Sequence, residues 1–65
     1  MNDYFSLTNK FTEQGYKNLG CANVNSAACE AMQKTTNAKW FKIDRCEHLV
    51  VCHDLRVFFT VDSGD

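Results

Sequence analysis

The chain has 65 residues, enough for a single domain spanning 1–65 with a thin hydrophobic core, and its 45% hydrophobic content excludes a disordered chain. Seven Lys and Arg stand against eight Asp and Glu, for a net charge of -1, and the two signs are interspersed along the chain. This balance argues against a strongly basic nucleic-acid binder and against an acidic mimic of DNA, since both need a large excess of one charge.

The first twenty residues are predicted to form a β-hairpin and a bend. Residues 3–8 and 16–19 have the character of two short strands, and the turn signal at 13–15 lies between them. Gly20 indicates a bulge or bend after the second strand, because a glycine at such a position weakens regular pairing. The hairpin would supply the first two strands of the sheet.

An alternative for the same stretch is an N-terminal helix that begins at Ser6. Leu7 and Phe11 are four residues apart, so a helix would place them on one side, and Gly15 would then end the helix. We take the hairpin as the prediction for residues 3–19 and keep the helix as the alternative.

A helix is predicted over residues 25–36. Asn25 is a good N-cap, and Val24 and Cys29 stand at the two positions of a hydrophobic staple. Asn37 offers a stop, because Asn tolerates the left-handed conformation that ends helices. Mostly small side chains on one stripe predict close packing on the sheet; the stripe consists of Ala28, Ala31, Met32 and Thr35.

From Lys39 onward, β-branched and aromatic residues dominate, and three runs have the character of strands. Connections as short as these exclude a parallel crossover, so the three strands are expected to be antiparallel. The chain is therefore predicted to be an α+β domain with the order ββαβββ, a small antiparallel sheet with one helix packed on one face. The three runs are 40–44, 48–52 and 56–62, separated by polar breaks at 45–47 and 53–55.

The cysteines and histidines are residue types that bind zinc. Cys46, His48 and Cys52, with Cys21 or Cys29 as a fourth ligand, would satisfy the tetrahedral preference of zinc. The paired Cys-x-x-Cys spacing of zinc knuckles is absent from the sequence. Structural thiols are the preferred interpretation, with zinc ligands or disulfides as the alternatives, so neither a metal site nor a cofactor is predicted.

The sequence favours neither an enzyme nor a membrane protein. A Cys–His nucleophile pair needs a cleft, for which a thin domain of this size has little volume, and no phosphate-binding loop is present. No signal-peptide pattern opens the chain, and no apolar run reaches the roughly 20 residues of a membrane span. We therefore expect a non-enzymatic protein of the cytoplasm, where thiols stay reduced.

One face of the predicted sheet is expected to be open, because a single helix covers only one side. Alternation along the strands puts two large aromatics on that open face, amid charged side chains. A large aromatic beside charged residues resembles the anchors of protein interfaces, where Trp, Tyr and Arg are enriched. The predicted partner-binding residues are Trp40, Phe58, Lys42, Asp44 and Arg56.

The layout of a hairpin, a small-residue helix at 25–36 and a three-strand block at 39–62 resembles very small proteins of bacteriophages and mobile elements. Some type I anti-CRISPR proteins and phage inhibitors of host RNA polymerase are similar in scale and layout. The resemblance is one of topology; no motif is shared and no site residue carries over. It implies a steric inhibitor that docks on a host protein or protein complex, and self-association into a homodimer is a further use of the same surface.

Two alternative functions depend on other residues. One is a small zinc-stabilised module built on the Cys and His cluster above. The other is a nucleic-acid-associated module, in which basic side chains lie beside an aromatic that stacks on bases. Its residues would be Lys39, Lys42, Arg45 and Arg56, with Trp40 as the aromatic.

Overall fold

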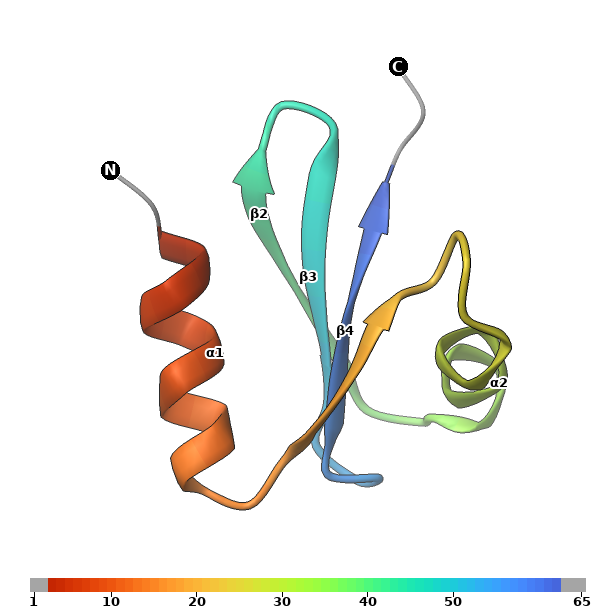
Figure 1. Ribbon diagram of the computed structural model, residues 1–65. Coiled ribbons are helices and arrows are strands. Elements are labelled where there is room, and N and C mark those ends of the chain that lie inside the picture. Colours follow the sequence, from red (N-terminus) through yellow and green to blue (C-terminus); the bar gives the residue numbers. More distant parts are fainter. Residues whose placement is uncertain (1–2, 63–65) are drawn as a thin grey trace.

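The computed structural model describes residues 3–62 and shows two helices and a four-stranded sheet in that range (Figure 1). Along the chain the elements follow the order αβαβββ. This order corrects the expected ββαβββ, because the first element is a helix instead of a strand. The elements are α1 (Asp3–Glu13), β1 (Lys17–Cys21), α2 (Ser26–Lys34), β2 (Ala38–Asp44), β3 (Glu47–Cys52) and β4 (Val57–Asp62).

The sheet has the strand order β1-β4-β3-β2, so the last strand in sequence lies in its interior. β2, β3 and β4 are joined by short turns and pair antiparallel, as predicted for the three C-terminal runs. β1 pairs parallel with β4, which makes the sheet mixed where an antiparallel sheet was expected. Parallel pairing is open to β1 because α2, β2 and β3 separate it from β4 along the chain, so no tight turn joins the two strands.

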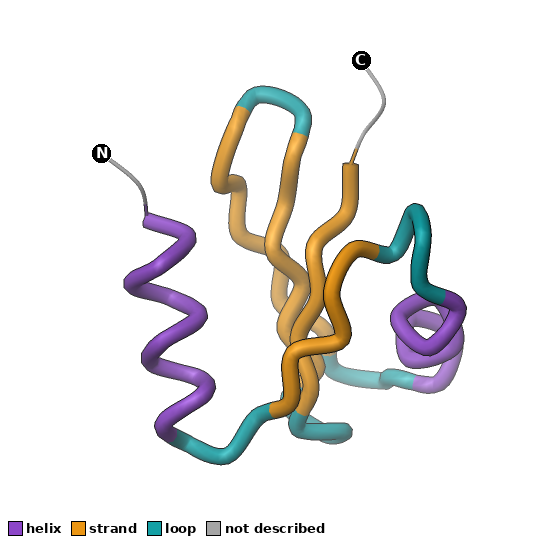
Figure 2. Tube along the Cα trace, in the orientation of Figure 1, coloured by secondary structure: helices purple, strands orange, loops and turns teal. Residues whose placement is uncertain are grey.

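The two helices cover opposite faces of the sheet. α1 stands on one side and α2 on the other in Figures 1 and 2, which view the sheet with β1 nearest to the reader. The expectation of one helix on one face is therefore wrong, and the described part of the chain forms three layers. Its buried apolar side chains divide accordingly into two clusters, one on each side of the sheet.

α1 forms because its apolar residues recur at helical spacing. Tyr4, Leu7 and Phe11 follow one another at intervals of three and four residues, and all three pack in the cluster on the α1 side of the sheet. The helical alternative for the N-terminal stretch is therefore correct, and the predicted hairpin over residues 3–19 is wrong.

Gly15, which belongs to the predicted hairpin turn, follows the end of α1 in the structure. Gly15 has a φ of +92°, and its N–H donates to the Thr12 carbonyl at 3.0 Å. Tyr16 N–H donates to the Phe11 carbonyl at 2.9 Å. These two bonds form a Schellman motif, and the rings of Tyr16 and Phe11, 5.2 Å apart, supply its hydrophobic contact. Gly15 therefore ends a helix.

Phe11 is the side chain that attaches α1 to the sheet. Its ring centre lies 6.3 Å from that of Phe58 on β4 and 6.4 Å from that of Phe41 on β2. These distances are typical of aromatic pairs in protein cores. The face that was expected to be open is thus covered, and the buried residues of this cluster are Phe11, Leu49, Val51 and Phe58.

α2 confirms the predicted N-cap but not the predicted staple. Asn25 Oδ1 accepts a hydrogen bond from Ala27 N–H at 2.9 Å. Val24 is 87% exposed and Cys29 is exposed as well, so the two do not pack as a staple. The small-residue stripe does face the sheet; the buried residues of this cluster are Ala28, Ala31, Val50, Cys52 and Phe59.

The C-terminal end of α2 is held by Asp54 from the β3–β4 turn. Asp54 accepts hydrogen bonds from the Thr35 hydroxyl at 2.6 Å and from Thr36 N–H at 2.9 Å. These bonds lower the pKa of the Asp54 carboxyl to about 2, since they favour its charged form. Thr35 is an extended C-cap, so the helix ends before the stop predicted at Asn37.

Two strands contain bulges. The pairing of β1 with β4 shifts between Asn18 and Cys21, where Gly20 has a φ of +88°, which confirms the bulge predicted at this glycine. The pairing of β2 with β3 shifts between Lys42 and Asp44. The second bulge, at the end of an edge strand, changes the side of the sheet from which the last residue of β2 projects.

Candidate functional site

Trp40 is a large aromatic side chain that the fold leaves uncovered. It lies on the edge strand β2, opposite the fully buried Val50 of β3. Val50 belongs to the cluster beneath α2, so Trp40 projects from the same side of the sheet. α2 packs against β1 and β4, toward the other edge, and the indole remains 53% exposed.

Two polar side chains flank Trp40, and we call the three residues Trp40, Lys42 and His48 the Trp40 patch. His48 lies on β3 directly opposite Lys42. The ring centre of His48 is 5.8 Å from that of Trp40, with an angle of 67° between the ring planes, which is an edge-on contact. The patch therefore joins a broad aromatic surface to an exposed ammonium group on two adjacent strands.

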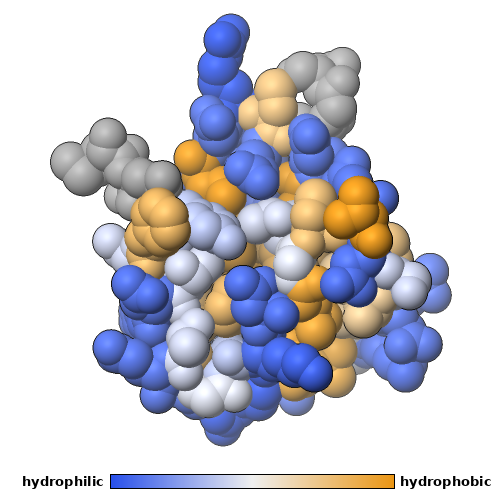
Figure 3. All heavy atoms as spheres, viewed as in Figure 1, coloured by the Kyte–Doolittle hydropathy of each residue, from blue (hydrophilic) through white to orange (hydrophobic). Residues whose placement is uncertain are grey.

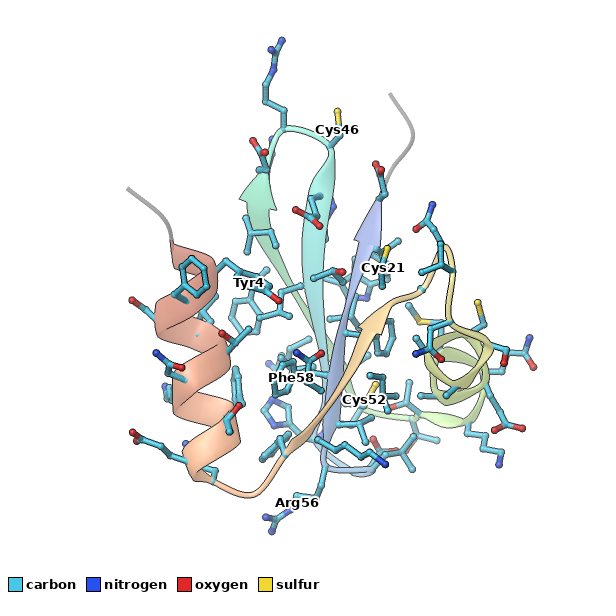
Figure 4. All side chains as sticks on the ribbon, in the orientation of Figure 1. Tyr4, Cys21, Cys46, Cys52, Arg56 and Phe58 are labelled. Carbon is cyan, nitrogen blue, oxygen red and sulfur yellow. The ribbon has the colours of Figure 1, made fainter. Side chains whose placement is uncertain are left out.

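Phe58 does not belong to this surface. It is 1% exposed and lies between the sheet and α1 (Figure 4). Phe58 pairs with Val51, whereas Trp40 pairs with Val50, and neighbouring residues of one strand project to opposite faces. The expected exposure of Phe58 is thus wrong, because α1 covers its face of the sheet.

Asp44 and Arg56 lie at opposite ends of the sheet. Asp44 ends β2, where its Oδ1 accepts from the N–H of the next residue at 2.7 Å. Arg56 lies in the β3–β4 turn with a φ of +59°, and its guanidinium is 5.6 Å from the centre of the Tyr16 ring. Of the five predicted binding residues, only Trp40 and Lys42 share one surface.

A polar cluster that no sequence pattern signals joins the start of β1 to the β3–β4 turn. The Tyr16 hydroxyl is 2.9 Å from Nδ1 of His53, and both residues are half-buried. The His53 ring also packs edge-on against Phe11, 6.0 Å away between ring centres. Arg56 completes the cluster above the Tyr16 ring. Its members belong to segments far apart in the chain, and their contacts tie the end of α1 to the turn.

The residues of the zinc alternative do not come together. Cys46 lies in the β2–β3 turn, whereas Cys52 is buried beneath α2 at the opposite end of β3 (Figure 4). Between residues 3 and 62, no three His, Cys, Asp or Glu side chains are grouped as a metal ion would require. Burial also raises the pKa of the Cys52 thiol, which favours its unreactive protonated form.

The basic residues of the nucleic-acid alternative are dispersed. Lys39 and Lys42 are three positions apart on β2, so they project from opposite faces of the sheet. Arg45 follows β2 at one end of the sheet, and Arg56 precedes β4 at the other. A nucleic-acid backbone is bound by cations along a continuous track. The fold places Lys42 beside Trp40 and the other three cations elsewhere.

The side of the molecule that carries the β1 edge has a mixed polar and apolar surface. In Figure 3, hydrophilic side chains cover most of this view, and apolar residues show between them as separate patches. Scattered apolar residues of this kind are normal for a protein surface. Within residues 3–62, neither helix has the length and apolarity needed to cross a membrane.

Likeness to known proteins does not assign this chain to a family. The layout that resembled small phage inhibitors begins with a hairpin, and α1 occupies that place in the structure. The surface features of the folded chain are therefore what points to its function. No protein-family model, no curated protein and no solved structure matches the chain.

Proposed function

We propose that this chain is a non-enzymatic binding protein that docks the Trp40 patch onto a larger host protein or protein complex and blocks it sterically. The observation that carries the proposal is the 53% exposure of Trp40 beside a well-packed core. A partner that covers the indole removes apolar area from water, which is favourable. Trp is also among the residue types most enriched at the energetic centres of protein interfaces.

The patch is supported by a rigid base. Val50, opposite Trp40, is fully buried, and the edge-on ring of His48 limits the positions open to the indole. A side chain that is already restrained loses less conformational entropy when a partner binds. The ammonium group of Lys42 adds a charge that favours an acidic surface on the partner and orients its approach.

A binding role also fits the burial and the hydrogen bonds of the cysteine and histidine side chains that catalysis would need. Cys52 is buried, and its thiol has a raised pKa. The exposed Cys29 donates from its thiol to the Ala22 carbonyl at 3.2 Å. His53 shares its Nδ1 with the Tyr16 hydroxyl. The proposal therefore assigns structural roles to these residues and no catalytic role to any of them.

The proposal is tested by comparing what the wild-type protein and the Trp40→Ala variant retain from a cell lysate, with quantitative mass spectrometry of the bound proteins. Loss of an interface anchor weakens binding by about 2 kcal/mol or more, roughly 30-fold in the dissociation constant. We expect one protein or complex to be enriched by the wild type and strongly depleted with the variant. Its affinity is then measured with purified components.

Phe5→Ala is the matched control, because Phe5 is an exposed aromatic, 61% accessible, on α1 at the other side of the sheet. This variant should retain the partner as the wild type does. Equal capture by wild type and Trp40→Ala, with unchanged thermal unfolding of the variant, would refute the Trp40 patch as the binding surface. Equal losses in both variants would indicate general stickiness of apolar side chains and would count against the proposal as well.

A further inference from the structure

β2 is an edge strand, and its outer side carries backbone groups that no strand of the described chain pairs. His53 N–H donates to the Asn37 carbonyl at 3.2 Å, so this pair is a hydrogen-bonded pair at the start of the β2–β3 ladder. Every second pair of an antiparallel ladder is hydrogen-bonded in this way, so the backbone N–H and C=O of Lys39 and Phe41 bond to β3. The residues whose backbone N–H and C=O point outward are then Ala38, Trp40 and Lys42.

The two ends of β2 carry opposite charges. Lys39 stands near its start and Asp44 at its end, and both are exposed. The bulge after Lys42 sets Asp44 opposite Glu47. Glu47 projects from the same side of β3 as the buried Leu49 and Val51, which face α1. Asp44 therefore projects from the α1 side of the sheet, as Lys39 does. In an antiparallel pair of two such strands, the basic start of one lies beside the acidic end of the other.

We propose that two copies of this chain associate by pairing their β2 edges antiparallel, centred on Phe41, so that their sheets become continuous. In this register Trp40 of each copy lies opposite Lys42 of the other, and both belong to the outward-pointing set that forms the new hydrogen bonds. Phe41 lies opposite Phe41 of the second copy on the α1 side. Lys39 lies opposite Ile43 of the second copy, next to the Asp44 that the bulge turns to the same side of the sheet.

This register is favoured over its neighbours by overlap and by charge. A shift of two residues toward the end of the strand places Lys42 opposite Lys42 of the second copy, which is repulsive. A shift of two residues toward the start pairs Trp40 with Trp40 but leaves Asp44 beyond the shared ladder. The central register pairs β2 over its full length, with a Trp–Lys cation–π contact and a Lys–Asp ion pair occurring twice each.

A second copy fits this edge because the edge is complementary to itself. Exposed edges are normally protected by charges that repel a second strand, whereas here the charges match in the antiparallel sense. The contact area of one strand edge is small, so the association is weak and reversible. This association goes beyond the proposed function, since it concerns assembly. The dimer would set the two Trp40 patches on the same side of a joined sheet, where a large partner engages both.

Charge reversal at the two ends of β2 tests the register. Sedimentation velocity of the purified chain from micromolar to millimolar concentration should show a reversible monomer–dimer equilibrium. Lys39→Glu alone and Asp44→Lys alone each turn two attractive pairs into repulsive ones, and we expect each to weaken the dimer about tenfold. The double variant K39E/D44K restores the attraction with the signs exchanged and should return the dissociation constant to within about threefold of wild type.

Lys42→Pro tests the backbone pairing independently of charge. The Lys42 N–H points away from β3, so proline there removes no bond of the ladder but blocks the outer edge. We expect a monomer with preserved circular dichroism, whereas Lys42→Ala retains measurable dimer. A wild-type chain that stays monomeric at millimolar concentration, or a double variant that does not recover, would overturn the inference. Neither result affects the capture of a partner by the Trp40 patch, because K39E leaves all three patch residues in place.

Discussion

Replacing Gly15 by Ala isolates the conformational cost of the helix end. Gly15 has a φ of +92°, and a Cβ built there would meet no atom within 4 Å, so a steric clash adds nothing to the effect. A residue with a side chain costs about 1–2 kcal/mol in the left-handed region, and Gly→Ala returns about 0.4–1 kcal/mol by restricting the unfolded chain. The free energy of unfolding should fall by about 1 kcal/mol, which lowers Tm by about 4–8 °C in a domain of this size.

The measurement is thermal unfolding of both proteins followed by far-ultraviolet circular dichroism. Gly15→Asn is the matched variant, because Asn tolerates the left-handed conformation better than Ala and should lose less stability. Gln14→Ala, at the neighbouring exposed position, controls for an unspecific effect on the loop. If the Gly15→Ala variant unfolds at or above the temperature of the wild type, Gly15 does not adopt a positive φ and the Schellman end of α1 is incorrect.

Two further substitutions test the packing and the electrostatics. The pKa of Asp54 is held near 2, below the ordinary 3.8, so its hydrogen bonds stabilise the fold above about pH 4 and this stabilisation is lost as the pH falls through about 2. Asp54→Asn should therefore flatten this part of the curve of unfolding free energy against pH, measured by urea unfolding. A wild-type curve that is equally flat would contradict this prediction. Phe58→Ala should lower the free energy of unfolding, measured by urea unfolding, by about 3–5 kcal/mol out of roughly 3–10 kcal/mol for a chain of this length. Trp40→Ala should keep its fold, and a Phe58→Ala variant as stable as wild type would place Phe58 at the surface.

The C-terminal strands were predictable because their signals are local. Each run is dense in β-branched and aromatic residues, and the turns between them are too short for anything but antiparallel neighbours. The position of α2 and its N-cap were predictable for the same reason, since Asn25 bonds to a residue two positions away. The predicted staple did not form, since Val24 is 87% exposed and Cys29 is exposed as well.

Local signals left the N-terminal stretch ambiguous: the spacing of Leu7 and Phe11 fits a helix, but a glycine such as Gly15 suits both a hairpin turn and a helix end. What decides between them is distant in sequence. Phe11 packs against Phe41 and Phe58, which belong to strands near the other end of the chain. The helix is stabilised by contacts that no window around Gly15 contains.

The candidate site was predicted only in part, because alternation within a strand does not give the phase between strands. Trp40 and Phe58 were assigned to one face, yet they pair with Val50 and Val51, which point to opposite faces. Phase depends on the length of the turns and on bulges such as the one that follows Lys42. Trp40 is exposed, as the alternation predicted, but its contact with His48 is recognisable only in the folded protein.

The place of β4 in the middle of the sheet has a consequence for the timing of synthesis. Before β4 is available, β2 and β3 can pair as a hairpin, whereas β1 lacks the strand with which it pairs in the sheet. Only β4, once it leaves the exit tunnel, inserts between β3 and β1 and unites the two parts in one step. A nascent chain interrupted before β4 therefore lacks its central strand, leaves the apolar faces of β3 and both helices without their main partner, and becomes a substrate for chaperones and proteases.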